Sequence, residues 1–139
     1  MSERESVFAP GAPPAIGPYS HAVSAGGLLF CSGQIPLDPA TGELVPGGAA
    51  EQARQCLANL TAVCEAAGTS LSRAVRVGVY MVDLAEFAAV NDVYAEFLAG
   101  GEDGGEGRGA SNAPPARVTV GVAALPKGAQ VEIDAVVAL

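Results

Sequence analysis

The sequence predicts an α+β fold in which a single mixed β-sheet of about six strands carries two helices on one face. Two observations support this prediction. Apolar residues recur with a helical period in two segments, and in four others they alternate or run continuously, as in β-strands. The segments follow one another in the order strands, helix, strand, helix, strands. Both helices are therefore expected to cover the same face of the sheet.

The first elements are a short strand at residues 28–31 and a helix at residues 49–67. The strand is an apolar run, LLFC, that follows a Gly-Gly pair. The apolar residues of the helix are spaced three or four apart and so share one face. They are Ala53, Cys56, Leu57, Leu60, Val63, Cys64 and Ala67. Gly68 is expected to end this helix, because glycine adopts the left-handed conformation of a helix C-terminus at little cost.

A second strand and a second helix follow at residues 75–82 and 84–98. Alternation places two sets of strand residues on opposite faces: Val75, Val77, Val79 and Met81 on one, and Arg76, Gly78, Tyr80 and Val82 on the other. The apolar stripe of the helix consists of Leu84, Phe87, Val90, Tyr94, Phe97 and Leu98. Asp83 is the predicted N-cap, with Glu86 three residues later as in a capping box.

The last two strands lie at residues 117–122 and 130–137, where valine, isoleucine and alanine alternate with polar or small residues. The sheet face away from the helices is expected to carry small or mixed residues: Gly78, Tyr80, Thr119, Gly121 and Val136. Such a face is neither apolar enough for a core nor charged enough for water. It predicts a subunit interface, and hence a homo-oligomer.

Length and composition restrict the class of protein. A chain of 139 residues is expected to form one domain spanning residues 1–139, with a flexible glycine-rich loop at residues 100–112. The net charge of −8 argues against a nucleic-acid partner, because phosphate binding needs clustered basic residues. The charged first residues and the lack of a long apolar run lead us to expect a cytoplasmic protein without a membrane segment.

Most signatures of metal, cofactor and nucleophile chemistry are absent from the sequence. The three cysteines and the single histidine lack metal-ligand spacing, so we expect neither a metal site nor a cofactor. His21 is interpreted as a strand residue with ordinary hydrogen bonds rather than as part of a catalytic triad. Cys31 has no nearby base to activate it as a nucleophile.

Arg117 is the residue most open to a functional interpretation. It opens a valine-rich strand, on a face expected to hold few charges. An arginine there either binds the carboxylate or phosphate of a ligand, or forms a structural ion pair with Glu132 or Asp134. Spacing alone leaves both readings open. Glu132 is expected on the same kind of face, where its carboxylate could position or deprotonate a water molecule.

A series of motifs resembles the reactive intermediate deaminases, the RidA or YjgF-like family. In order along the chain they include AIGPYS at residues 15–20, SGQIP at 32–36, DPATG at 38–42, PAR at 115–117, LPKG at 125–128 and VEI at 131–133. The resemblance implies a chorismate-mutase-like α+β subunit that assembles as a homotrimer with ligand clefts between subunits. It also implies hydrolysis of 2-enamine or 2-imine acids (2-aminoacrylate, 2-iminopropanoate, 2-iminobutanoate) to 2-keto acids and ammonia, without a cofactor.

The same resemblance implies roles for individual residues. The arginine of the PAR motif binds the substrate carboxylate in this family, a role that falls on Arg117. The glutamate of the VEI motif, thought to orient the water, corresponds to Glu132. Tyr19 and Ser32 match residues that line the pocket, and Asn91 matches a more peripheral position. Thr119 stands where a cysteine is common, which is tolerable if a backbone group at that position binds the substrate.

Two other functions are consistent with the sequence. The first is a non-catalytic binder of small carboxylates that uses the same arginine. The second is a chaperone-like interaction protein, or a translation inhibitor that cleaves RNA, as some relatives have been described. The negative charge argues against RNA, whose backbone would be repelled.

Overall fold

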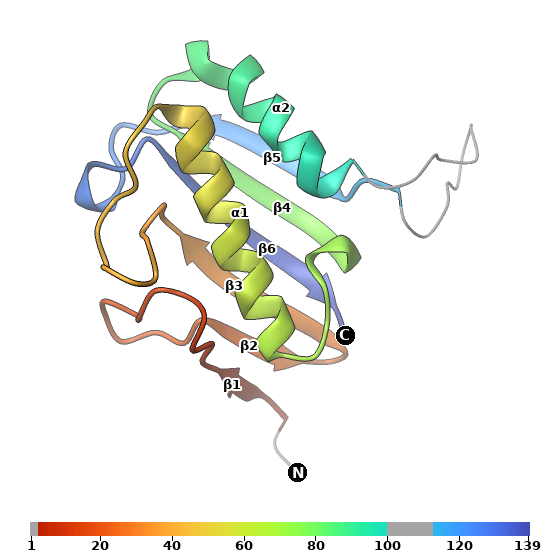
Figure 1. Cartoon of the computed structure of the whole chain (residues 1–139). Coiled ribbons are helices and arrows are strands. Elements are labelled where there is room, and N and C mark those ends of the chain that lie inside the picture. Colours follow the sequence, from red (N-terminus) through yellow and green to blue (C-terminus); the bar gives the residue numbers. More distant parts are fainter. Residues whose placement is uncertain (1–2, 100–112) are drawn as a thin grey trace.

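Six β-strands form one mixed sheet in the computed structural model, which describes residues 3–99 and 113–139. They are β1 (Glu5–Val7), β2 (Ala22–Ala25), β3 (Leu28–Gln34), β4 (Ala74–Met81), β5 (Ala116–Gly121) and β6 (Val131–Ala138). Their order across the sheet is β1-β2-β3-β6-β4-β5 (Figure 1). β4 and β5 pair in parallel, and the other neighbours pair antiparallel. The loop expected at residues 100–112 lies outside the described residues.

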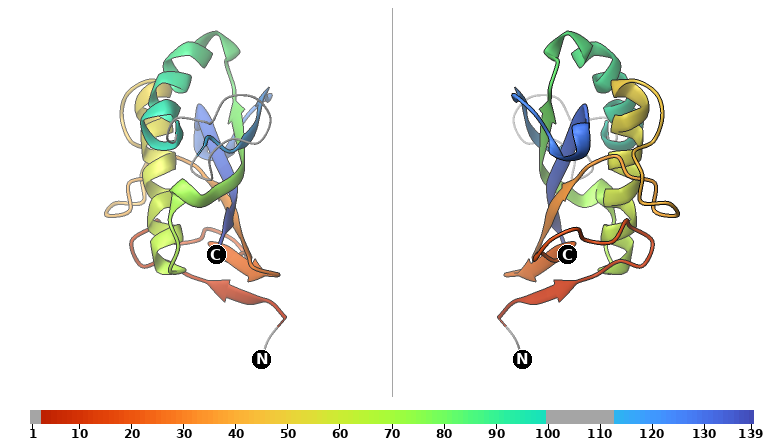
Figure 2. Two further views of the ribbon diagram at one scale, coloured as in Figure 1. Left: turned by 90° about the vertical axis from the view of Figure 1, so that its right-hand side faces the viewer. Right: turned by 90° about the vertical axis from the view of Figure 1, so that its left-hand side faces the viewer.

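Both helices lie on the same face of this sheet, which Figure 2 shows edge-on. α1 (Ala49–Ala66) packs over β3 and β6, and α2 (Phe87–Leu98) lies beside α1. Under the helices, the sheet contributes these buried side chains to the core: Leu29, Cys31, Val77, Val79, Met81, Val131, Ile133, Ala135 and Val137. The predicted fold class is confirmed.

Gly68 ends α1 as expected. Its φ angle of +81° is in the left-handed region. Its amide donates to the Glu65 carbonyl, and the Thr69 amide donates to the Cys64 carbonyl, both at 3.0 Å. This is the pair of hydrogen bonds that defines a Schellman motif. At the other end, the Gly48 amide donates to Glu51 Oε1 at 2.7 Å. The helix ends one residue earlier than predicted.

The second predicted helix is divided in the structure. Residues 84–86 form a 3₁₀ turn, η2 (Leu84–Glu86), and Asp83 caps this turn by accepting a hydrogen bond from the Ala85 amide at 3.0 Å. Leu84 and Phe87 are 52% and 38% exposed, so their placement in the buried stripe was wrong. The buried residues of α2 are Val90, Val93, Tyr94 and Leu98. No helix in the described ranges is long and apolar enough to cross a membrane.

A β-bulge at Val75 alters the predicted alternation of β4. Ala74 lies opposite Val137, and Arg76 lies opposite Val136, so that β4 has one extra residue at this point. Val75 is therefore exposed, whereas Val77, Val79 and Met81 are buried as predicted. Beyond the bulge the pairing with β6 is regular.

The register of β5 contradicts the predicted faces of three of its residues. Arg117 lies beside Val77 and Thr119 beside Val79, and paired residues of parallel strands point to the same side. Arg117, Thr119 and Gly121 therefore face the helices. The open face carries Gly78, Tyr80 and Val136 as expected, together with Phe30, Arg76, Val118, Val120, Glu132 and Asp134.

Candidate functional site

Arg117 lies against α2. Its Nη1 donates to Asn91 Oδ1 at 2.7 Å. Its guanidinium carbon lies 4.7 Å from the centroid of the Tyr94 ring and 5.5 Å from that of the Phe87 ring. These residues line or adjoin a pocket of about 400 Å³, which is lined by Asn91, Tyr94, Ala95, Leu98, Ala99, Pro114, Pro115 and Arg117. The arrangement presents a cation beside a cavity.

No acidic side chain of residues 3–99 or 113–139 forms an ion pair with Arg117. Within the described residues the one ion pair is formed by Arg54 and Glu96, at 2.8 Å on the surface. Glu132 and Asp134 project from the opposite face of the sheet, so the structural ion pair considered from the sequence does not form. The expectation that Arg117 and Glu132 share a face was also wrong. The guanidinium is left able to bind an anion.

Glu132 belongs to a second pocket, of about 330 Å³, on the other side of the sheet. It is lined by Ile16, Tyr19, Ser32, Gly33, Ile35, Pro126 and Glu132. The carboxylate lies directly over Gly33, where a Cβ atom would overlap it. Burial, and then the nearby charge of Asp134, raise the pKa of Glu132 above its ordinary value. A raised pKa makes the ionised carboxylate a stronger base.

Ser32 is fixed by two hydrogen bonds. Its hydroxyl donates to the Ser20 carbonyl at 2.7 Å, and its amide donates to the His21 carbonyl at 2.9 Å. Because its proton is already used, the oxygen of Ser32 is left to act as an acceptor. Tyr19, also exposed to the pocket, accepts a hydrogen bond from the Ile16 amide at 3.2 Å.

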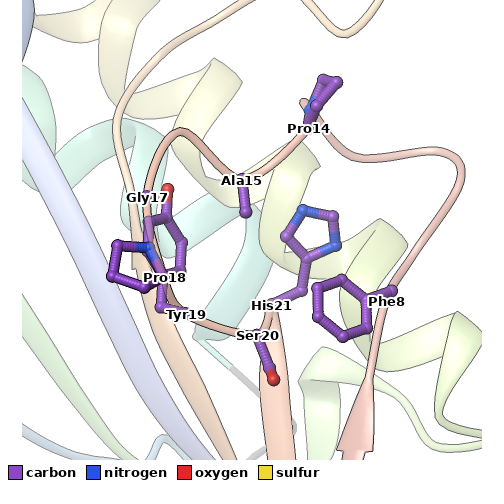
Figure 3. Close-up of a pocket in the computed structure, with 8 residues that line it drawn as sticks. All are labelled: Phe8, Pro14, Ala15, Gly17, Pro18, Tyr19, Ser20 and His21. Carbon is purple, nitrogen blue, oxygen red and sulfur yellow. The ribbon is translucent and has the colours of Figure 1, made fainter.

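Figure 3 shows the His21 ring beside that of Phe8, at the end of the segment that carries Tyr19. The His21 ring is buried, with Nδ1 accepting from the Ala9 amide and Nε2 donating to the Pro13 carbonyl, each at 2.8 Å. A hollow of about 620 Å³ lies beside it, lined by Phe8, Pro14, Ala15, Gly17, Pro18, Tyr19, Ser20 and His21. The ordinary hydrogen bonds predicted for His21 are present, but its predicted place in a strand was wrong, because β2 begins at Ala22.

All three cysteines are free, buried thiols, and a hydrogen bond with Cys31 lowers the pKa of Cys64. A hydrogen bond with Cys64, together with burial, raises the pKa of Cys31. Burial raises the pKa of Cys56, whose thiol contacts the Val131 carbonyl at 3.5 Å. In the described part of the chain, no group of histidine, cysteine, aspartate and glutamate side chains could hold a metal ion.

The candidate residues therefore fall into two groups on opposite faces of the sheet. Arg117 and Asn91 form one group; Tyr19, Ser32 and Glu132 form the other. Thr119 lies on the Arg117 side, where its hydroxyl is buried without a hydrogen-bond partner among residues 3–99 and 113–139. The sequence reading missed Phe87 and Tyr94 as contacts of Arg117. Their spacing from Asn91, four and three residues, was the available signal, because it places all three on one helix face.

Comparison with known proteins identifies the family. The family model described as endoribonuclease L-PSP matches residues 10–139. The chain belongs to this family, also named YjgF/RidA.

Relatives within the YjgF/RidA family cover nearly the whole chain. A RutC family protein of Sinorhizobium fredii, y4sK, is 51% identical over 128 residues, which are 92% of each chain. A 2-iminobutanoate/2-iminopropanoate deaminase of Bos taurus is 43% identical over 125 residues, 90% of this chain and 82% of that protein. The crystal structure of the YjgF gene product of E. coli matches with a TM-score of 0.83 and 41% identity, covering 96% of this chain and 98% of that one.

Proposed function

We propose that the chain hydrolyses reactive 2-enamine and 2-imine acids, such as 2-aminoacrylate, 2-iminopropanoate and 2-iminobutanoate, to 2-keto acids and ammonia. The observation that carries this proposal is the Arg117 guanidinium, which Asn91 holds beside a cavity without an acidic partner in the described residues. Family membership and relatives that bear the name 2-iminobutanoate/2-iminopropanoate deaminase, at 40–43% identity, support the choice of substrate.

The proposed active site is completed between subunits of a homotrimer. Arg117 and Glu132 lie on opposite faces of one sheet, so a small substrate cannot contact both within one chain. A neighbouring copy can supply the missing group. The open sheet face, with Phe30 46% and Val120 37% exposed, offers apolar surface for such a contact.

In this site the substrate carboxylate binds the guanidinium of Arg117 by charge-assisted hydrogen bonds. An enamine substrate first tautomerises to the imine, as C3 takes a proton from water and the nitrogen gives one up to water. Glu132 of the adjoining subunit then takes a proton from a water molecule, whose oxygen forms a bond to C2. The imine nitrogen takes this proton from Glu132, which gives the carbinolamine. Glu132 then takes the proton of the carbinolamine hydroxyl and passes it to the nitrogen, which leaves as ammonia. The C–N bond breaks and the C=O bond of the keto acid forms.

Ser32 and Tyr19 are proposed to orient the reacting group. The oxygen of Ser32 has its proton donated to Ser20, so it accepts a hydrogen bond from the N–H of the imine rather than donating to the carboxylate. Tyr19 covers the same pocket. Thr119 is proposed to contribute through its backbone beside Arg117. The main contribution of the protein is orientation, because water attacks such imines unaided.

The test couples the protein to a serine or threonine dehydratase in buffer that contains semicarbazide, which traps the imine. The wild-type protein is expected to lower the yield of semicarbazone. Arg117→Ala is expected to lose about a hundred-fold or more in kcat/KM, because it removes more than one hydrogen bond to a charged group. Arg54→Ala, which removes an exposed arginine of the Arg54–Glu96 ion pair, is the matched control and retains activity. An unchanged semicarbazone yield with the wild type contradicts the proposal.

The Arg117 guanidinium, held beside a cavity, also fits a non-catalytic binder of small carboxylates. The two functions differ at Glu132, because only hydrolysis requires a base. If the wild-type protein binds 2-oxobutanoate but does not consume the imine, the binder is favoured. In the enzyme, Glu132→Gln is expected to retain binding and lose turnover.

A further inference from the structure

Three side chains of α2 form one face of the helix, and Arg117 lies against that face. Phe87, Asn91 and Tyr94 are four and three residues apart, so the helical period stacks them along one side of the helix. β5 begins beside this face, with Arg117 as its second residue. The helix period and the parallel pairing of β5 with β4 together bring one cation to two aromatic rings and an amide.

The contacts hold the guanidinium without cancelling its charge. The distances of 4.7 Å to the Tyr94 ring and 5.5 Å to the Phe87 ring are within the range of about 6 Å in which a ring attracts a cation. The third contact, from Nη1 to Asn91 Oδ1 at 2.7 Å, is also to a neutral group. A carboxylate in the same place would occupy the site of the ligand anion.

Burial in the hydrophobic core explains an aromatic ring at position 94 but not at position 87. Tyr94 is 7% exposed and belongs to the core, with its hydroxyl unpaired among the described residues. Phe87 is more than one-third exposed, so much of its ring adds little to the core. This ring also lies 5.5 Å from the guanidinium carbon of Arg117.

We propose that Phe87 and Tyr94 are positioning residues that hold the Arg117 guanidinium in one orientation for the carboxylate of the ligand. The inference rests on the proposed function, in which Arg117 binds that carboxylate. An unsupported arginine side chain samples many rotamers, and fixing it on binding costs conformational entropy. Contacts made beforehand reduce this cost. Binding of the anion also removes water from the guanidinium, which strengthens its attraction to the rings.

The test measures affinity separately from turnover. Phe87→Leu is expected to weaken binding of 2-oxobutanoate, measured by calorimetry, by about five- to thirty-fold. KM for the imine is expected to rise by a similar factor, with a smaller change in kcat. Phe87→Tyr keeps a ring over the guanidinium and is expected to restore affinity. Phe97→Leu makes the same change on α2 in a side chain that packs on the core, and is expected to leave affinity unchanged.

Tyr94 gives a second comparison. Tyr94→Leu is expected to weaken 2-oxobutanoate binding, and Tyr94→Phe, which keeps the ring, to restore it. Because Tyr94 is buried and its loss could unfold the chain, Phe87→Leu is the deciding variant. Unchanged affinity in Phe87→Leu, or an equal loss in Phe97→Leu, overturns this inference alone. Failure of the wild-type protein to bind 2-oxobutanoate overturns it together with the proposed function.

Discussion

The Arg117 guanidinium and the Glu132 carboxylate lie on opposite faces of the sheet. Arg117 is paired with Val77, whose side chain is under the helices, and Glu132 is paired with Tyr80 on the open face. The faces of a strand are fixed by its pleat, so no change of rotamer within one chain brings the two groups together. A reaction that needs both groups has to use two chains.

Mixing two inactive variants tests this consequence. Arg117→Ala subunits retain Glu132, and Glu132→Gln subunits retain Arg117. If the chain forms the proposed homotrimer, each trimer that contains both variants has one cleft with both natural residues. Random mixing by co-expression is therefore expected to recover about a quarter of wild-type activity. The measurement is the rate of the dehydratase-coupled assay per subunit. Each variant alone is the control, and mixtures that remain inactive contradict a site shared between subunits.

Asp134 is expected to set the pH dependence of the reaction through Glu132. The two carboxylates are two residues apart on the same face of β6. Burial is the larger cause of the raised pKa of Glu132, and the charge of Asp134 is the second. Asp134→Asn removes the charge and keeps an acceptor for the Tyr80 hydroxyl, which donates to Asp134 at 3.1 Å. The pKa of Glu132 then falls, so this residue is ionised at lower pH.

The acid limb of kcat/KM against pH is therefore expected to move to lower pH in Asp134→Asn, because Glu132 acts as a base only when ionised. Asp83→Asn is the control, since it removes the same charge at the cap of η2 and is expected to leave the limb in place. An acid limb that Asp134→Asn does not move would indicate that another group is the base.

The fold was predictable because its signals are local. The period of α1, the glycine after it and the alternation of β6 depend on neighbouring residues alone. The bulge at Val75 and the faces of β5 were not predictable in this way. Alternation divides a strand into two sets of residues, but the pairing of β5 with β4 decides which set lies under the helices.

The sequence indicated which residues belong to the candidate site, but it did not indicate how they are arranged in space. The motifs indicated Arg117 and Glu132, but the sequence reading placed both on one kind of face. Phe87 and Tyr94 were placed in the core stripe, because an apolar residue at helical spacing is usually buried. Their contact with Arg117 depends on how α2 lies against the edge strand, and hence on tertiary packing.

Gly33 is expected to be required for activity, because the Glu132 carboxylate occupies the space of a side chain at this position. Gly33→Ala has to displace the carboxylate, at a cost of about 1–3 kcal/mol for overpacking. We expect kcat/KM to fall about ten-fold or more, with a lower Tm in thermal denaturation. Gly11→Ala is the matched control, because its nearest neighbour would be Ala62 Cβ at an ordinary 3.6 Å. Full activity in Gly33→Ala would show that the position of Glu132 is unimportant.

His21 is expected to stabilise the segment that carries Tyr19. His21→Leu leaves the Ala9 amide and the Pro13 carbonyl without their partner, at about 1–3 kcal/mol for each buried group. We expect a lower Tm, a higher KM and faster hydrogen exchange at the Ala9 amide. Exchange at Ala9 reports the bond to Nδ1 directly. Phe8→Leu, which removes a ring 5.8 Å from that of His21 but leaves both bonds, is the control. If the Ala9 amide is still protected from hydrogen exchange in His21→Leu, a group other than His21 holds this segment in place.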